Sequence, residues 1–268
     1  MLTEGIIFKN FSTKVNLSKI KANLLKLIKK NFEVINSLST NYKYSFKKNQ
    51  INTYKKYSNF RVIGMGGSSL GTQAIYEFLK FKIKKKFYFI DNFENTIDKN
   101  KKKKFVNLII SKSGNTIESI VNSNILIKKN DKNIFITENN HNYLYKLANK
   151  LKAEIIHHNN FIGGRYSVLS EVGMLPSELM GLKSSHFKQF NYLIKNKNFL
   201  NSLIANVGST LYLLKKNKFN SIIINYDEKS ENLFKWYQQL VAESLGKNNK
   251  GILPIISNMP RDNHSVMQ

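Results

Sequence analysis

The stretch FRVIGMGGSSLG, residues 60–71, decides the fold class of this chain of 268 residues. Its first four residues form a short apolar run that predicts a buried strand, and Thr72–Leu79 continues in helical spacing. A strand, a glycine-rich turn and a helix in this order point backbone N–H groups and a helix N-terminus at an anion. The turn matches the dinucleotide-binding pattern G-x-G-x-x-G only in part, because Ser69 stands in place of the third glycine.

A second strand-to-helix turn lies in FVNLIISKSGNTIE, residues 105–118, and it is the more informative of the two. Residues 105–110 predict a strand, and the turn that follows combines a lysine with small and hydroxyl-bearing residues. Because N–H groups, hydroxyls and a helix dipole converge there, the turn predicts a phosphate-binding site. In the alternative interpretation, one Ser or Thr caps the helix in a capping box with Glu118, which leaves the other hydroxyls without a role.

Strands and helices alternate along most of the chain, which predicts an α/β fold with doubly wound parallel sheets and ligands at the carboxyl ends of the strands. A basic amphipathic helix is predicted at residues 17–35, and it either packs on the protein or lies on a membrane surface. Further strands are predicted at residues 86–90, 133–137, 153–156, 221–226 (a buried type) and 251–256, and further helical patterns at 187–197 and 200–214.

Residues 230–246 predict an amphipathic helix, because apolar residues recur at helical spacing along them. Ser230 is the expected N-cap and Gly246 the expected residue after the C-terminus. Gln239 and Glu243 are four residues apart and share one face of this helix. Glu243 lies in the last turn, near the negative end of the helix dipole, where an ionised carboxylate is disfavoured and a proton acceptor is favoured. The alternative is an ordinary solvated glutamate.

The formal charge of +26 favours anionic partners. Whether lysine or arginine supplies this charge narrows the class of anionic partner. The excess is almost all lysine, spread along the chain, and the only arginines are Arg61, Arg165 and Arg261. Nucleic-acid readers depend on arginine for bidentate contacts, so we expect small anionic molecules and neither nucleic acid nor membrane as partners. The run Lys99–Lys104 is expected to be a solvated turn. A charge-driven binder of polyanions is the alternative, and its affinity would fall steeply with salt.

Cysteine is absent, no apolar run is long enough to cross a bilayer, and the N-terminus lacks the pattern of a signal peptide, so we expect a cytoplasmic protein. The histidines show no metal-ligand spacing, and the adjacent His157 and His158 should point to opposite faces of a strand. We therefore expect no metal.

Four motifs together resemble the glucose-6-phosphate isomerase family, whose members are built from two sugar-isomerase domains. They are GMGGSSLG (64–71), SKSGNTIES (111–119), GGRYSVLSEVG (163–173) and QQLVAESLGK (238–247). The resemblance spans residues 60–268 and implies an N-terminal helical segment (1–57), a first sugar-isomerase domain (58–181) and the start of a second, incomplete one (182–268). The family continues beyond this point and supplies a C-terminal lysine to the active site, so we expect a C-terminally truncated member with an exposed edge on its second sheet.

The resemblance implies the interconversion of glucose 6-phosphate and fructose 6-phosphate, a step of glycolysis and gluconeogenesis that needs no cofactor. Glu243 would move a proton between C2 and C1, Arg165 would stabilise the enediolate, and His264, reaching in from the neighbouring subunit of a homodimer, would assist ring opening. The residues expected to contact the sugar phosphate are Gly67, Ser68, Ser111, Lys112 (through its backbone), Ser113, Thr116 and Gln239. The alternatives are a non-catalytic sugar-phosphate-binding module and an inactive fragment of the isomerase.

Overall fold

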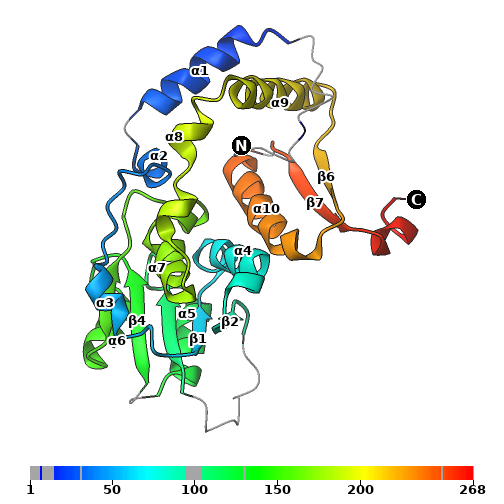
Figure 1. Cartoon of the computed structure of the whole chain (residues 1–268). Coiled ribbons are helices and arrows are strands. Elements are labelled where there is room, and N and C mark those ends of the chain that lie inside the picture. The colour runs from blue at the N-terminus through cyan, green and yellow to red at the C-terminus, as the bar shows by residue number, and fades with distance from the viewer. Residues whose placement is uncertain are drawn as a thin grey trace.

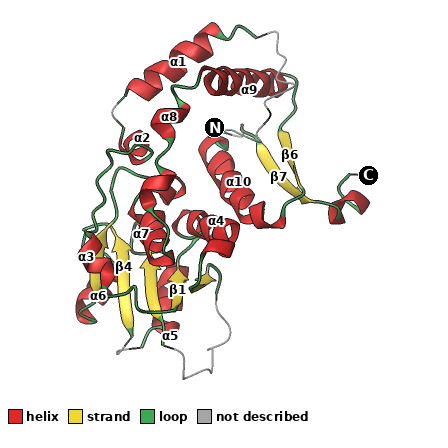
Figure 2. Cartoon of the chain, viewed as in Figure 1, coloured by secondary structure: helices red, strands yellow, loops and turns green. Residues whose placement is uncertain are grey.

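The structure is a computed structural model that describes residue 7 and residues 15–30, 32–93, 104–128, 131–248 and 250–267. Most of the N-terminal stretch and most of the Lys99–Lys104 run lie outside the described residues. The solvated turn expected at Lys99–Lys104 therefore stays a prediction. Figure 1 shows the arrangement of the elements along the chain, and Figure 2 separates helices from strands.

A five-stranded parallel sheet in the order β2-β1-β3-β4-β5 forms the centre of the protein. This confirms the prediction of an α/β fold with a parallel central sheet, and every predicted strand of this sheet lies within one residue of its observed bounds. The strands are β1 (Asn59–Ile63), β2 (Lys86–Ile90), β3 (Val106–Ile110), β4 (Lys132–Thr137) and β5 (Glu154–His157). Strand β2 lies on one side of β1, and β3 and the later strands lie on the other side. The chain therefore changes direction across the sheet between β1 and β3, and the ends of these two strands flank the place where such sheets bind ligands.

Helices cover both faces of this sheet, which explains why most residues of its central strands are apolar and buried. One face packs against α4 (Leu70–Leu79) and α7 (Glu171–Met180), together with α3 (Lys48–Asn52). The other face packs against α5 (Ile117–Leu126) and α6 (Tyr143–Lys150). Successive strand residues alternate between the two cores, as Leu108 and Ile109 do.

The N-terminal pattern forms two helices instead of the single one predicted. Helix α1 (Ser18–Lys29) ends before α2 (Glu33–Ser37) begins. Helix α1 buries none of its residues completely and contacts α9 (Lys197–Lys215). Within the part of the chain that the structure describes, no helix combines the length and the apolar character needed to cross a membrane.

The second part of the chain holds a two-stranded parallel sheet of β6 (Asn220–Asn225) and β7 (Leu253–Asn258). Strand β6 is not the buried strand that was predicted: Ile222 and Ile224 are about half exposed, because only one face of this small sheet is covered. Of the helical pattern at 187–197, only α8 (Phe190–Leu193) forms an α-helix. Helix α10 (Glu231–Leu245) packs on β7 and also on α4, and so joins the two sheets (Figure 1). The division into two sugar-isomerase domains stays a prediction.

Candidate active site

The two predicted anion-binding turns lie side by side because they follow neighbouring strands. β1 pairs with β3 up to Ile63 and Ile109, so both turns leave the sheet at the same edge. A Cβ added at Gly64 would lie 2.9 Å from the carbonyl oxygen of Ile110, the last residue before the second turn. The glycine is therefore required for the close approach of the two backbones.

The first turn also meets the segment that carries Arg165. A Cβ at Gly67 would lie 2.2 Å from the carbonyl carbon of Gly164, and Ser167 Oγ donates to the carbonyl of Gly67 at 3.4 Å. Ser68, the other predicted sugar contact in this turn, is half-buried. The first turn and the 3₁₀ turn η3 (Gly164–Leu169) are thus packed backbone to backbone.

The second turn is closed by its own hydroxyl groups. The Ser111 and Thr116 hydroxyls lie 2.9 Å apart, and the Gly114 N–H donates to Ser111 Oγ at 3.2 Å. Ser111 is buried, whereas Ser113 is exposed and Thr116 half-buried. Thr116 occupies the N-cap position of α5 without a capping bond from its side chain, so the capping-box interpretation is wrong.

Lys112 directs its side chain away from this turn. Its Nζ donates to the carbonyl of Asn160 at 2.8 Å and lies 3.4 Å from Glu138 Oε1. Only the backbone of Lys112 is left for a ligand in this conformation, which is the part of the residue that the sequence analysis expected to be used.

Helix α10 brings Glu243 and Gln239 to Arg165. Arg165 Nη1 donates to Glu243 Oε1 at 2.8 Å, and the Gln239 amide donates to Glu243 Oε2 at 3.3 Å. The Arg165 side chain is 21% exposed and that of Glu243 is 47% exposed, so the carboxylate can still be reached by a ligand. A Cβ at Gly66 would lie 2.7 Å from Gln239 Nε2, and Gln239 Oε1 is buried without a hydrogen-bond partner among the described residues. The helix therefore contacts the first turn as well as η3.

The ends of α10 differ from the prediction in their chemistry. Ser230 is the N-cap residue by position, but its hydroxyl donates to Asp227 Oδ2 at 2.6 Å and does not cap the helix. Gly246 follows the helix with a φ of −74°, outside the left-handed region. A Cβ there would lie 2.5 Å from the carbonyl oxygen of Ala242, so close backbone contact accounts for this glycine.

His264 is not brought to this cluster by its own chain. It ends a short 3₁₀ turn (Arg261–His264) that follows β7, and its side chain is exposed. In Figure 1 the C-terminal end lies beyond β7, on the side away from α4. Its predicted role in a neighbouring subunit stays a prediction.

Two residues at the site were not singled out from the sequence, although they stand in its motifs. Tyr166 and Ser244 directly follow Arg165 and Glu243, and their hydroxyl oxygens lie 2.6 Å apart. Arg165 Nε also donates to Ser244 Oγ at 2.8 Å. Their position next to the two predicted catalytic residues was the available clue.

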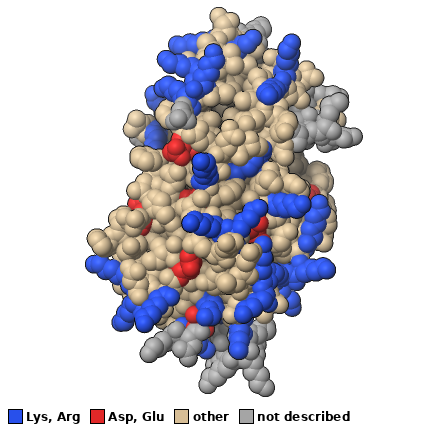
Figure 3. Space-filling view, turned by 60° about the vertical axis from the view of Figure 1, so that its left-hand side comes forward, with Lys and Arg blue, Asp and Glu red and all other residues tan. Residues whose placement is uncertain are grey.

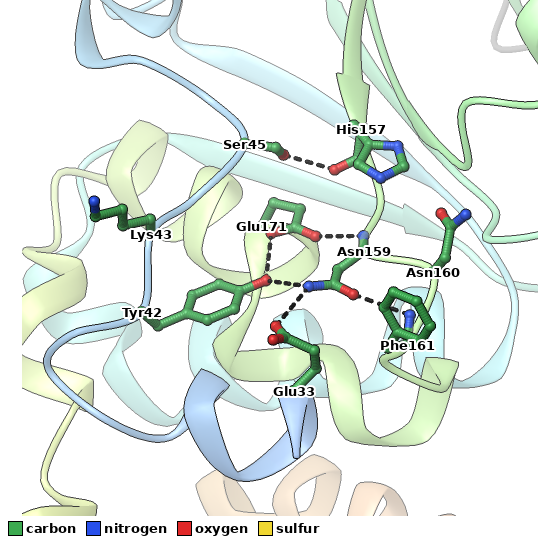
Figure 4. Close-up of a pocket in the computed structure, with 9 residues that line it drawn as sticks. All are labelled: Glu33, Tyr42, Lys43, Ser45, His157, Asn159, Asn160, Phe161 and Glu171. Carbon is green, nitrogen blue, oxygen red and sulfur yellow. Dashed lines mark hydrogen bonds between the residues drawn. The ribbon is translucent and has the colours of Figure 1, made fainter. Parts of the chain in front are cut away.

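A pocket of about 420 Å³ is lined in part by the loop that leads into η3 (Figure 4). The Tyr42 hydroxyl donates to Glu171 Oε2, the Asn159 N–H donates to Glu171 Oε1, and the Asn159 amide donates to Glu33 Oε2. Burial raises the pKa of Glu171. None of the sequence-predicted site residues lines this pocket, and its partners are too far apart in the sequence for a motif to reveal them.

The surface charge is scattered. On the face shown in Figure 3, lysine and arginine side chains are spread from end to end and do not gather in one patch. Among the described residues, no group of three or more His, Cys, Asp or Glu side chains could hold a metal ion.

Comparison with known proteins identifies relatives over most of the chain. The family model described as phosphoglucose isomerase matches residues 36–253. The glucose-6-phosphate isomerase of Methanocaldococcus jannaschii is 36% identical over 79% of this chain and 56% of its own length. That of Acholeplasma laidlawii is 33% identical over 80% of this chain and 56% of its own length. The chain thus spans about half the length of the curated relatives it matches.

Solved structures share the fold at low identity. A hypothetical protein of Thermus thermophilus matches with a TM-score of 0.68 at 20% identity, covering 93% of this chain and 66% of its own. The tagatose-6-phosphate ketose/aldose isomerase of Escherichia coli matches with a TM-score of 0.53 at 12% identity, covering 96% of this chain and 71% of its own.

Proposed function

Because the chain belongs to the phosphoglucose isomerase family, we propose that it interconverts glucose 6-phosphate and fructose 6-phosphate by proton transfer through an enediolate. The observation that carries the proposal is the 2.8 Å contact between Arg165 and Glu243 beside the first glycine-rich turn. The contact supplies a proton acceptor and a fixed cation, two elements that this chemistry needs, and the hydroxyl-lined turn that follows the neighbouring strand is proposed as the third.

In the proposed reaction, Ser111, Ser113 and Thr116 bind the phosphate, with the backbone of Lys112 and the dipole of α5. Gly67, Ser68 and Gln239 contact the sugar. Glu243 removes the proton from C2, the C–H electrons form the C1=C2 bond, and the oxygen on C1 gains negative charge beside Arg165. Glu243 then returns the proton to C1, while the hydroxyl proton on the C2 oxygen passes to the C1 oxygen, so that C2 becomes the carbonyl carbon and C1 carries the hydroxyl. No step in this sequence requires a cofactor.

We place the reaction in the cytoplasm, in glycolysis and gluconeogenesis, and in a homodimer whose partner subunit supplies His264 for ring opening. The exposure of His264 is compatible with such a role. Mixing Glu243→Gln protein with His264→Ala protein should then restore activity that neither variant has alone, because half of the sites in a mixed dimer would carry both side chains.

The test of the function is exchange of the C2 hydrogen of glucose 6-phosphate with D₂O, followed by NMR. Wild-type protein should catalyse exchange, and Glu243→Gln should lower its rate about 10²-fold or more, the typical cost of losing a general base. Glu231→Gln is the matched control, since Glu231 is on the same helix and forms an ion pair with Lys235 across one helical turn. Equal rates in wild type and Glu243→Gln would remove Glu243 from its role.

The second candidate is a sugar-phosphate-binding module or inactive fragment without turnover. It is the alternative that the sequence analysis left open. It predicts binding of glucose 6-phosphate with no exchange at C2 in the wild-type protein.

A further inference from the structure

Two neighbouring residues on η3 contact two neighbouring residues on α10. Arg165 donates through Nη1 to Glu243 and through Nε to Ser244, each at 2.8 Å. The Tyr166 hydroxyl lies 2.6 Å from the same Ser244 oxygen. Two nitrogen atoms of the guanidinium therefore donate hydrogen bonds to α10, and the Ser244 hydroxyl is shared between Arg165 and Tyr166.

The plane and the backbone of Arg165 are held as well. Its Cζ lies 4.6 Å from the centre of the Tyr166 ring, which is a cation–π distance. The indole N–H of Trp236 donates to the Arg165 carbonyl at 3.1 Å. A long side chain that would rotate freely in water thus has one orientation in the folded chain.

We propose that Ser244 and Tyr166 are positioning residues, which keep the Arg165 guanidinium stationary while its anionic partner changes. The proposal rests on the proposed function. When Glu243 takes the proton from C2, its carboxylate becomes neutral and the negative charge appears on the oxygen of the enediolate. A cation already in place stabilises this charge without reorganising, which is how preorganised sites lower a barrier.

The hydrogen-bonding capacity of the groups supports this assignment. Among the described residues, Nη2 of Arg165 has no hydrogen-bond partner, so its two N–H groups are free for the enediolate oxygen. Ser244 Oγ can accept two hydrogen bonds and donate one, which suits an atom shared by Arg165 Nε and the Tyr166 hydroxyl. Removing this oxygen would leave both groups unpaired and would let the guanidinium rotate.

The test measures binding to the full chain of two probes, inorganic phosphate and a phosphorylated aldonohydroxamate, a planar anion that mimics the enediolate. Ser244→Ala should weaken hydroxamate binding about tenfold, the loss expected from one hydrogen bond to a charged group. Binding of phosphate should not change, because the Ser111–Thr116 turn makes no contact with Ser244 in the hydrogen-bond network described above. Tyr166→Phe should act in the same direction, and Ser244→Thr should restore hydroxamate binding.

Ser209→Ala is the matched control, because it removes a helix hydroxyl that has no hydrogen-bond partner; both affinities should stay at the wild-type value. A spectroscopic measurement reads the contact directly. The chain has three arginines, so the Nε–H signal of Arg165 can be resolved by NMR, and Ser244→Ala should speed its exchange with water.

Wild-type affinity for the hydroxamate in Ser244→Ala, or an equal loss of both ligands, would overturn the positioning role. A wild-type protein that binds phosphate but shows no preference for the hydroxamate would contradict the proposed function itself, and the positioning role with it.

Discussion

His158 should make the stability of this protein fall between pH 7 and pH 4. The residue follows β5 and is completely buried. Its Nδ1 lies 3.1 Å from the carbonyl of Asn159, so Nδ1 carries the proton of the neutral ring, because a carbonyl can only accept. Nε2 is buried and has no hydrogen-bond partner in the part of the chain that the structure describes, and Lys112 and His157 lie nearby. Burial lowers the pKa of His158 from 6.5 to about 4.

The sign and size of the effect follow from this pKa. Between pH 6.5 and pH 4 the unfolded chain binds a proton that the folded chain does not, so the free energy of unfolding falls as the pH is lowered through this range. At about 1.4 kcal/mol for each pKa unit, the contribution lost by pH 4 is about 3 kcal/mol. This is a large share of the stability of a typical domain.

Urea unfolding followed by circular dichroism at pH 7, 6, 5 and 4 measures the effect. In His158→Asn the new side chain keeps an N–H donor near the position of Nδ1 but does not titrate. The wild type should lose about 3 kcal/mol more than this variant between pH 7 and pH 4. His157→Asn, which changes the exposed neighbour, should follow the wild type. Parallel curves for the wild type and His158→Asn would refute the reasoning.

Two further predictions concern packing and a buried lysine. Gly67→Ala should lower the free energy of unfolding by about 1–3 kcal/mol, since its Cβ would overlap η3. Gly164→Ala should lower it less, because its Cβ would meet only Gly67 Cα, at 4.0 Å. Equal urea midpoints for the two variants would contradict the packing described. Lys188 is buried, donates to the carbonyls of Ser37 and Leu169, and has its pKa lowered to about 8 by burial. From pH 8 to 10 the unfolded chain keeps a proton that folded Lys188 releases, so wild-type stability should rise relative to Lys188→Met in urea unfolding; an unchanged difference would show that folded Lys188 keeps its proton.

The parallel sheet could be predicted from the sequence because its strands are short apolar runs that lead into glycine or hydroxyl turns. That pattern is local, and it recovers β1 and β3 within one residue. The Glu243 helix was predicted for the same reason. The pairing of Arg165 with Glu243 spans 78 residues and came only from the resemblance, because no local rule joins η3 to α10.

The sequence-based predictions were wrong or incomplete where the outcome depended on residues outside the local pattern. Ser230 has the right type and place for a capping residue, but Asp227 accepts its hydroxyl proton. Ile222 and Ile224 have the composition of a buried strand, yet burial depends on whether another layer covers them. The network of Tyr42, Asn159 and Glu171 joins segments more than one hundred residues apart, so no sequence pattern could reveal it.

The packing of α10 on α4 has a consequence for selectivity among sugars. Under the proposed function, the turn that binds phosphate follows a strand of the five-stranded sheet, and the carboxylate that removes the proton from C2 lies on α10, which packs on α4. The packing of α10 on α4 therefore fixes the distance between the turn and the carboxylate, and this distance selects ligands by length. Under the proposed function, a phosphosugar with a shorter carbon backbone would still dock by its phosphate but would present no hydrogen to Glu243.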